Sequence, residues 1–107
     1  MIEIQLSSVR TLLEKVALPA IIDYDDFDVL GVEFLIGDPV TSSIDWVRTV
    51  EEAQVSISYD RAAGAAYIRI RDGHSRYQLS TDVQAEIDEL GVLRSVSVDD
   101  EALPHTV

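Results

Sequence analysis

The chain has 107 residues, a formal net charge of -12 and no cysteine. A chain of this length forms one domain, 1–107, with a modest hydrophobic core, and a hydrophobic content of 47% argues against intrinsic disorder. The composition excludes disulfides, thiol chemistry and thiolate zinc sites, and the negative charge argues against nucleic acids and anionic membranes as partners.

The first residues do not predict export or membrane insertion. They lack the basic start and the long apolar run of a signal peptide. The longest apolar run, 16–22, contains Pro19 and is far shorter than the roughly 20 residues that cross a bilayer. We therefore expect a cytoplasmic protein with no membrane partner.

The N-terminal pattern predicts a short strand followed by a helix. Residues 1–6 alternate between apolar and polar side chains, which is typical of a half-buried strand. Ser7 can then cap a helix, and residues 9–17 place apolar side chains at helical spacing. Because Pro19 disfavours helical geometry at the residue before it, the helix is predicted to end near residue 17.

A β-hairpin is predicted next. The apolar runs 20–24 and 29–36 are rich in β-branched and aromatic residues, and 25–28 forms a polar tip between them. In the second run Val32 and Phe34 should share one face, with Glu33 on the other.

A second helix is predicted over 43–53, because Ser42 followed by Asp45 matches a capping box. Its inward side should carry Ile44, Val47 and Val50, with Trp46 beside them. Trp46 is the only tryptophan. We expect it to anchor the core rather than to bind a partner, since aromatic side chains bury the largest area per residue.

The second half of the sequence predicts strands and turns. The predicted strands are 55–59, 66–71, 76–81, 84–88 and 92–98. Two pairs of them are predicted to form hairpins, 55–59 with 66–71 and 84–88 with 92–98. By strand parity, Tyr59 should face the core and Tyr67 should face solvent. Residues 99–107 are acidic and then proline-containing, and they predict a flexible tail.

The sequence also contains a weak internal repeat. Residues 22–33 and 85–97 both consist of an apolar strand, an acidic turn and a second apolar strand. Two unrelated hairpins could look alike in this way, and so could the two halves of an old duplication within one sheet.

The segment 59–70, YDRAAGAAYIRI, carries a resemblance to a known family. It resembles the signature Y-D-x-E-A-D-x-L-Y-I-x-L of the YuzE-like proteins, a bacterial family of unknown function. The matching residues are Tyr59, Asp60, Ala63, Tyr67 and Ile68, and the departures are Ala62, Gly64 and Ala66. The family's closing G-I-E-I strand is matched better by 31–34 than by 95–98.

The resemblance covers 55–98 well and 20–53 weakly, consistent with a partial duplication. It implies a small α+β bacterial protein, and it carries no known catalytic residues.

No catalytic, cofactor-binding or metal-ligating residues are predicted. Counted from Asp23, the acidic turn departs from a calcium-binding loop at three positions. Ser80, Asp82 and His74 have the residue types of a catalytic triad, but no strained turn frames the serine. The five glycines are scattered singly, so no phosphate-binding loop is present.

One group of side chains is a candidate interaction patch. If 72–75 joins two paired strands, Arg71 lies opposite Arg76, and Tyr67 and Arg69 extend the same face. Like charges placed opposite each other are unfavourable. They require either nearby carboxylates and solvent, or an anion or acidic partner. The candidate patch consists of Tyr67, Arg69, Arg71 and Arg76.

The sequence as a whole predicts an α+β fold, with a single mainly antiparallel sheet of hairpins and two short helices packed on one face. The function it favours is a non-enzymatic protein-interaction or regulatory module that binds a protein partner or itself. The alternatives are a small-ligand or anion-binding domain that uses the arginine-lined strand face, and an enzyme with an unrecognised site.

Overall fold

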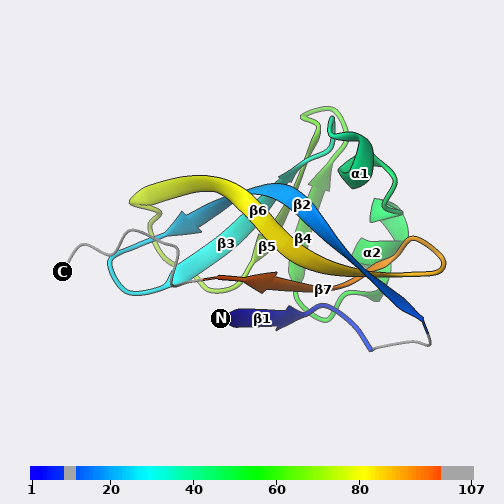
Figure 1. Ribbon diagram of the computed structural model, residues 1–107. Helices are drawn as coiled ribbons and strands as arrows, with labels where there is room; N and C mark the ends of the chain where they lie inside the picture. Colours follow the sequence, from blue (N-terminus) through cyan, green and yellow to red (C-terminus); the bar gives the residue numbers. More distant parts are fainter. Residues whose placement is uncertain (9–11, 100–107) are drawn as a thin grey trace.

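One antiparallel sheet curls around the core of this protein (Figure 1). The computed structural model describes residues 1–8 and 12–99. The strands are β1 (Ile2–Gln5), β2 (Leu13–Tyr24), β3 (Val29–Leu35), β4 (Ser56–Asp60), β5 (Ala65–Arg69), β6 (Tyr77–Asp88) and β7 (Leu93–Val98). Their order across the sheet is β1-β7-β6-β2-β3-β5-β4. Together with the short helices α1 (Pro39–Ser42) and α2 (Trp46–Glu52), this confirms the predicted α+β class with a mainly antiparallel sheet.

The curl brings the two edge strands of the sheet together at one point. The N–H of Gln54, just before β4, donates a 2.6 Å hydrogen bond to the carbonyl of Leu6, just after β1. Leu6 in turn donates its N–H to the carbonyl of Arg94, next to the start of β7, at 2.9 Å. The inner face of the sheet is therefore enclosed, and it holds the hydrophobic core.

The predicted helix over 9–17 is wrong from residue 13 onward, because β2 begins there; residues 9–11 lie outside the described part. Every second side chain from Leu18 to Tyr24 is buried, which is the period of a strand. β2 also pairs with β6 over its full length. Pro19 is tolerated because the pairing of β2 with β3 begins only at Ala20, so no ladder exists on that side of Pro19.

The predicted helix over 43–53 is present in a shorter form, as α2. Its N-cap is Asp45, whose carboxylate accepts a hydrogen bond from the N–H of Arg48, whereas Ser42 is the last residue of α1. Trp46 is buried, which confirms its prediction as a core anchor. Val47, predicted to face inward, is 60% exposed, because α2 turns Trp46 and Thr49 toward the core instead.

The three predicted hairpins β2–β3, β4–β5 and β6–β7 are confirmed, and Val32 and Phe34 are buried as expected. A pairing of the strands on either side of 72–75 is wrong. β5 pairs with β3, and β6 pairs with β2, so the whole β2–β3 hairpin lies between them. The strands predicted over 76–81 and 84–88 are one continuous strand, β6.

The sheet has an approximate two-fold arrangement. β2 and β6 form its centre, with β3 beside β2 and β7 beside β6. β5 then lies beyond β3, and β1 lies beyond β7. Ile4 of β1 pairs with Val96, and Ile68 of β5 pairs with Val32. The displacement along the chain from Ile4 to Ile68 equals that from Val32 to Val96, so β1-β2-β3 corresponds to β5-β6-β7 in strand order and register.

The turns of the two central hairpins repeat the same details. The strand register shifts between Asp23 and Tyr24 in the β2–β3 hairpin and between Glu86 and Ile87 in the β6–β7 hairpin. The next residues are Asp25 and Asp88, and each carboxylate accepts two backbone N–H groups of its own turn. These shared details favour a duplication over a chance similarity of two hairpins.

Candidate functional site

The candidate patch is divided between two places on the structure. Tyr67 and Arg69 lie on β5, on the outer face of the sheet, while Arg71 and Arg76 lie in the connection from β5 to β6. We call residues 70–76 the clamp loop, because they wrap around the tip of the β2–β3 hairpin, residues 25–28.

Backbone hydrogen bonds fix the clamp loop to the base of the hairpin tip. The N–H groups of Ile70 and Arg71 donate to the carbonyl of Leu30 at 2.8 and 3.2 Å, and the N–H of Arg76 donates to the carbonyl of Tyr24 at 3.1 Å. These bonds hold one end of the clamp loop against β3 and the other end against β2. Arg71 and Arg76 therefore lie beside opposite strands of the acidic hairpin.

Each of these arginines binds one aspartate of the hairpin tip. Arg71 Nη1 lies 3.0 Å from Asp28 Oδ2, and Arg76 Nη1 forms an ion pair with Asp26 Oδ2. Tyr77 adds a 3.1 Å hydrogen bond from its hydroxyl to the other oxygen of Asp26. The like charges predicted to lie opposite each other are therefore separated, and each is neutralised by a carboxylate.

The hairpin tip is also held from within by Asp25. Its Oδ1 accepts the N–H groups of Phe27 at 2.8 Å and Asp28 at 2.7 Å. These two bonds, with a smaller contribution from Arg71, lower the pKa of Asp25 below its ordinary value of 3.8. The turn is thus stabilised by an ionised carboxylate at neutral pH.

Phe27 projects from the apex of this braced turn and is 89% exposed. It is the most exposed of the large hydrophobic side chains among the described residues. The sequence interpretation treated 25–28 only as a polar tip. The signal that it overlooked was a single aromatic residue placed among three aspartates, where a solvated turn needs none.

Tyr67 is half-buried rather than exposed, because it lies across Gly31 on the neighbouring strand. A Cβ atom at Gly31 would lie 2.1 Å from the Tyr67 hydroxyl oxygen. Burial, and next the nearby Asp23 carboxylate, raise the pKa of Tyr67 above its ordinary value of 10.0. The guanidinium carbon of Arg69 lies 5.9 Å from the centroid of the Tyr67 ring, and its Nη1 lies 3.4 Å from Asp72 Oδ1. Arg69 is the exposed member of this pair. Tyr59, predicted to face the core, stacks on Trp46.

Replacing Gly31 with alanine should therefore destabilise the fold by about 1–3 kcal/mol, as expected for an overpacked site. The added Cβ would also lie 2.8 Å from the carbonyl oxygen of Ile68, which cannot move without shifting β5. Urea denaturation measures the effect. Gly37→Ala is the matched control, because nothing lies within 4 Å of its Cβ position and its φ is not positive. Equal stabilities of the two variants would contradict this packing.

A buried ion cluster lies at the other end of the sheet. Arg94 is 2% exposed, and its guanidinium donates to Asp88 at 2.8 Å, to Glu52 at 3.0 Å and to Ser7 at 2.7 Å. Burial opposes the charge on Arg94, but the hydrogen bonds to the two carboxylates outweigh it and raise the pKa of Arg94. Because all three nitrogens of the guanidinium contact protein oxygens, we interpret this cluster as a structural tie between α2, β6 and β7.

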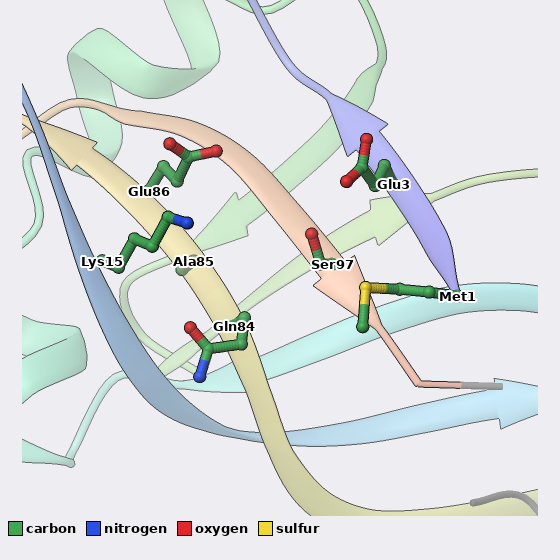
Figure 2. Close-up of a pocket in the computed structure, with 7 residues that line it drawn as sticks. All are labelled: Met1, Glu3, Lys15, Gln84, Ala85, Glu86 and Ser97. Atoms are coloured by element: carbon green, nitrogen blue, oxygen red, sulfur yellow. The ribbon is translucent and has the colours of Figure 1, made fainter. Parts of the chain in front are cut away.

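A shallow hollow of about 280 Å³ lies on the outer face across β1, β7, β6 and β2 (Figure 2). Figure 2 shows Lys15 next to Glu86, its partner in the ladder between β2 and β6, with Glu3 on β1 across the hollow. One lysine among carboxylates and amides does not form a nucleophile with an adjacent base. Within the described residues, no group of three or more His, Cys, Asp and Glu side chains could hold a metal ion.

Comparisons with protein-family models, curated proteins and solved structures return no match to this chain. The resemblance to the YuzE-like family therefore stays a prediction. In residues 1–8 and 12–99, neither helix has the length and apolar character needed to cross a bilayer.

Proposed function

We propose that this protein is a non-enzymatic interaction module that presents Phe27 to an apolar pocket of a protein partner. The observation that carries the proposal is the bracing of the hairpin tip. A highly exposed aromatic side chain stands on a turn that two ion pairs, a tyrosine hydroxyl and an internal carboxylate hold in one shape.

Rigid presentation matters because binding costs free energy when loops and side chains must become ordered. An aromatic anchor surrounded by charged groups is also the usual composition of an interaction hot spot and its rim. Here the rim consists of Asp26, Asp28, Arg71 and Arg76, two of which belong to the patch predicted from sequence. Tyr67 and Arg69 lie farther along β5.

The ion pairs favour a protein partner over the alternative of a small anion. A bound anion would have to compete with the carboxylate that each arginine already holds, at 3.0 Å for Arg71 and 3.4 Å for Arg69. A partner that buries Phe27 can use the same ion pairs as they stand. The surface that contacts the partner then carries charges of both signs around one aromatic ring.

Site-specific photo-cross-linking tests the proposal. With p-benzoylphenylalanine in place of Phe27, irradiation of the native host cells should give a discrete adduct, which mass spectrometry then identifies. An adduct of twice the monomer mass would identify the partner as a second copy. The same photo-amino acid in place of Val47 is the control, because that side chain is 60% exposed on α2, away from the tip (Figure 1).

The double variant Arg71→Ala/Arg76→Ala should lower the yield of the adduct, because it removes the clamp while leaving position 27 in place. The proposal fails if position 27 gives no discrete adduct, or if positions 27 and 47 give the same products.

A further inference from the structure

The first half of β2 has a strand on one side only. Residues 13–19 pair with β6, but β2 pairs with β3 only from Ala20 to Tyr24. Within the described chain, no strand continues the sheet along the other side of 13–19. Backbone N–H and C=O groups of this open edge are therefore available to an added strand, up to Pro19, which has no N–H.

A groove follows this open edge. A hollow of about 600 Å³ separates Glu14 and Val16 of β2 from Pro39 and Val40 of α1. A second hollow of about 200 Å³ lies toward the start of β2, where Leu12 and Leu13 line it. Glu14 lines both hollows, so together they form one groove along the start of β2.

Exposed apolar side chains gather along this groove. Leu12 and Val40 line its two hollows and are 71% and 42% exposed. Leu90, which is 55% exposed, lies between two residues that line the largest hollow. Apolar side chains that cluster beside unpaired strand groups mark an interaction site more strongly than scattered ones do.

The charge around the groove selects the partner. The exposed Glu14 side chain lines both of the hollows nearest the start of β2. Residues 1–54 carry 11 acidic and 3 basic residues, and the whole chain has a net charge of -12. A second copy of this acidic chain would be repelled, whereas a basic segment would be attracted.

We propose that the open edge of β2 binds an extended segment of a partner protein that carries lysine or arginine among apolar residues on one face of the strand. The segment adds a strand beside residues 13–18 and turns that face toward the groove. Its apolar side chains lie against α1, and a basic side chain lies near Glu14, which is on the same face of β2 as Val16. This site lies at the opposite end of β2 from Phe27, so it is separate from the braced tip and does not depend on it.

The test is a selection of displayed decapeptides on the full-length protein, followed by binding measurements with the winning peptide made synthetically. We expect basic, apolar peptides. Glu14→Lys should lower the affinity for the selected peptide by at least about tenfold, because it places like charges together. Glu3→Lys changes the net charge equally but lies away from the groove, and it should change binding by less than about twofold.

Selective N-methylation of the winning peptide distinguishes strand addition from simple charge attraction. Successive N–H groups of a strand point to opposite sides, so methylating one alternate set should abolish binding and methylating the other set should not. Phe27→Ser should leave peptide binding unchanged. The proposal is overturned if no peptide is selected, if Glu14→Lys and Glu3→Lys act equally, or if the two methylated forms bind alike.

Discussion

Replacement of Asp88 by alanine should lower the free energy of unfolding by about 3–5 kcal/mol, the usual cost of removing one partner of a buried ion pair. Asp88 Oδ2 lies 2.8 Å from both Nε and Nη2 of the buried Arg94. Its Oδ1 accepts the N–H groups of Leu90 and Val92 at 2.9 and 3.0 Å. In the variant the buried guanidinium of Arg94 loses one of its carboxylate partners, and the N–H groups of Leu90 and Val92 lose their acceptor. Urea denaturation at neutral pH measures the loss.

Asp25→Ala is the matched control for this prediction. Asp25 occupies the equivalent place in the β2–β3 hairpin and also accepts two N–H groups of its turn. It is only partly buried, however, and the arginine near its carboxylate, Arg71, is 56% exposed. Its loss of stability should be clearly smaller. Equal losses for the two variants would show that turn closure, and not the buried ion pair, dominates at Asp88.

The same carboxylates make the fold sensitive to acid. Burial opposes ionisation of Asp88, but the hydrogen bonds from Val92, Arg94 and Leu90 outweigh it and lower the pKa of Asp88 below 3.8. Hydrogen bonds from Arg48 and Arg94 lower the pKa of Glu52 below 4.5. A carboxyl whose pKa is lowered by folding stabilises the protein above its unfolded pKa, and this contribution is lost as the pH falls through the folded value. The stability gap between wild type and Asp88→Ala should therefore narrow below pH 3.8.

Replacing Trp46 with alanine should cost a similar amount, about 3–5 kcal/mol. The ring packs between Phe34, at 5.7 Å between ring centroids, and Tyr59, at 6.3 Å. Its Nε1–H donates a 2.9 Å hydrogen bond to the carbonyl of Thr41. Alanine leaves a cavity and removes one hydrogen bond to the Thr41 carbonyl, which keeps its bond from the N–H of Ile44. Calorimetry should show the melting temperature falling by roughly 4–8 °C per kcal/mol in a domain of about this size.

Two variants calibrate that result. Trp46→Phe keeps much of the aromatic packing but removes the donor to Thr41, and it should cost about 1–3 kcal/mol. Val47→Ala changes the exposed neighbour and should stay within about 0.5 kcal/mol of wild type. A cost for Trp46→Ala no larger than that of Val47→Ala would contradict its place in the core.

The hairpins could be read from the sequence because their signals are local. Tyr59 and Tyr67 flank a short turn in segments that alternate, and the strands indeed pair there. The relation of β5 to β6 is not local. Both strands also pair with the β2–β3 hairpin, and nothing within 65–88 reveals that this earlier hairpin lies between them.

The helix predicted over 9–17 failed for a related reason. Residues 12, 13 and 16 suit a helical stripe, but the buried positions from Leu18 to Tyr24 extend an alternating pattern back to Val16. A partner strand more than sixty residues later decides between the two, because β6 pairs with all of β2.

The candidate patch was only partly predictable. The excess of arginines around 69–76 is visible in the sequence, but the carboxylates that neutralise Arg71 and Arg76 come from a distant turn. That turn also carries Phe27. The clamp loop contacts the turn on both sides and leaves the Phe27 ring exposed at its apex. The open edge of β2 was hidden as well, since the segment had been assigned to a helix.

The pairing of β1 with β7 has a consequence for biosynthesis. Ile2 lies opposite Val98, so among the described strands the one that is synthesised earliest pairs with the one that is synthesised latest. The β2–β3 hairpin can form early, but β1 has no partner before β7 is made, and residues 13–19 of β2 have none before β6 is made. Such nonlocal pairing slows folding and leaves strand edges exposed in the nascent chain. Ribosome-bound fragments that end before residue 93 should therefore hold an apolar N-terminal strand without its partner.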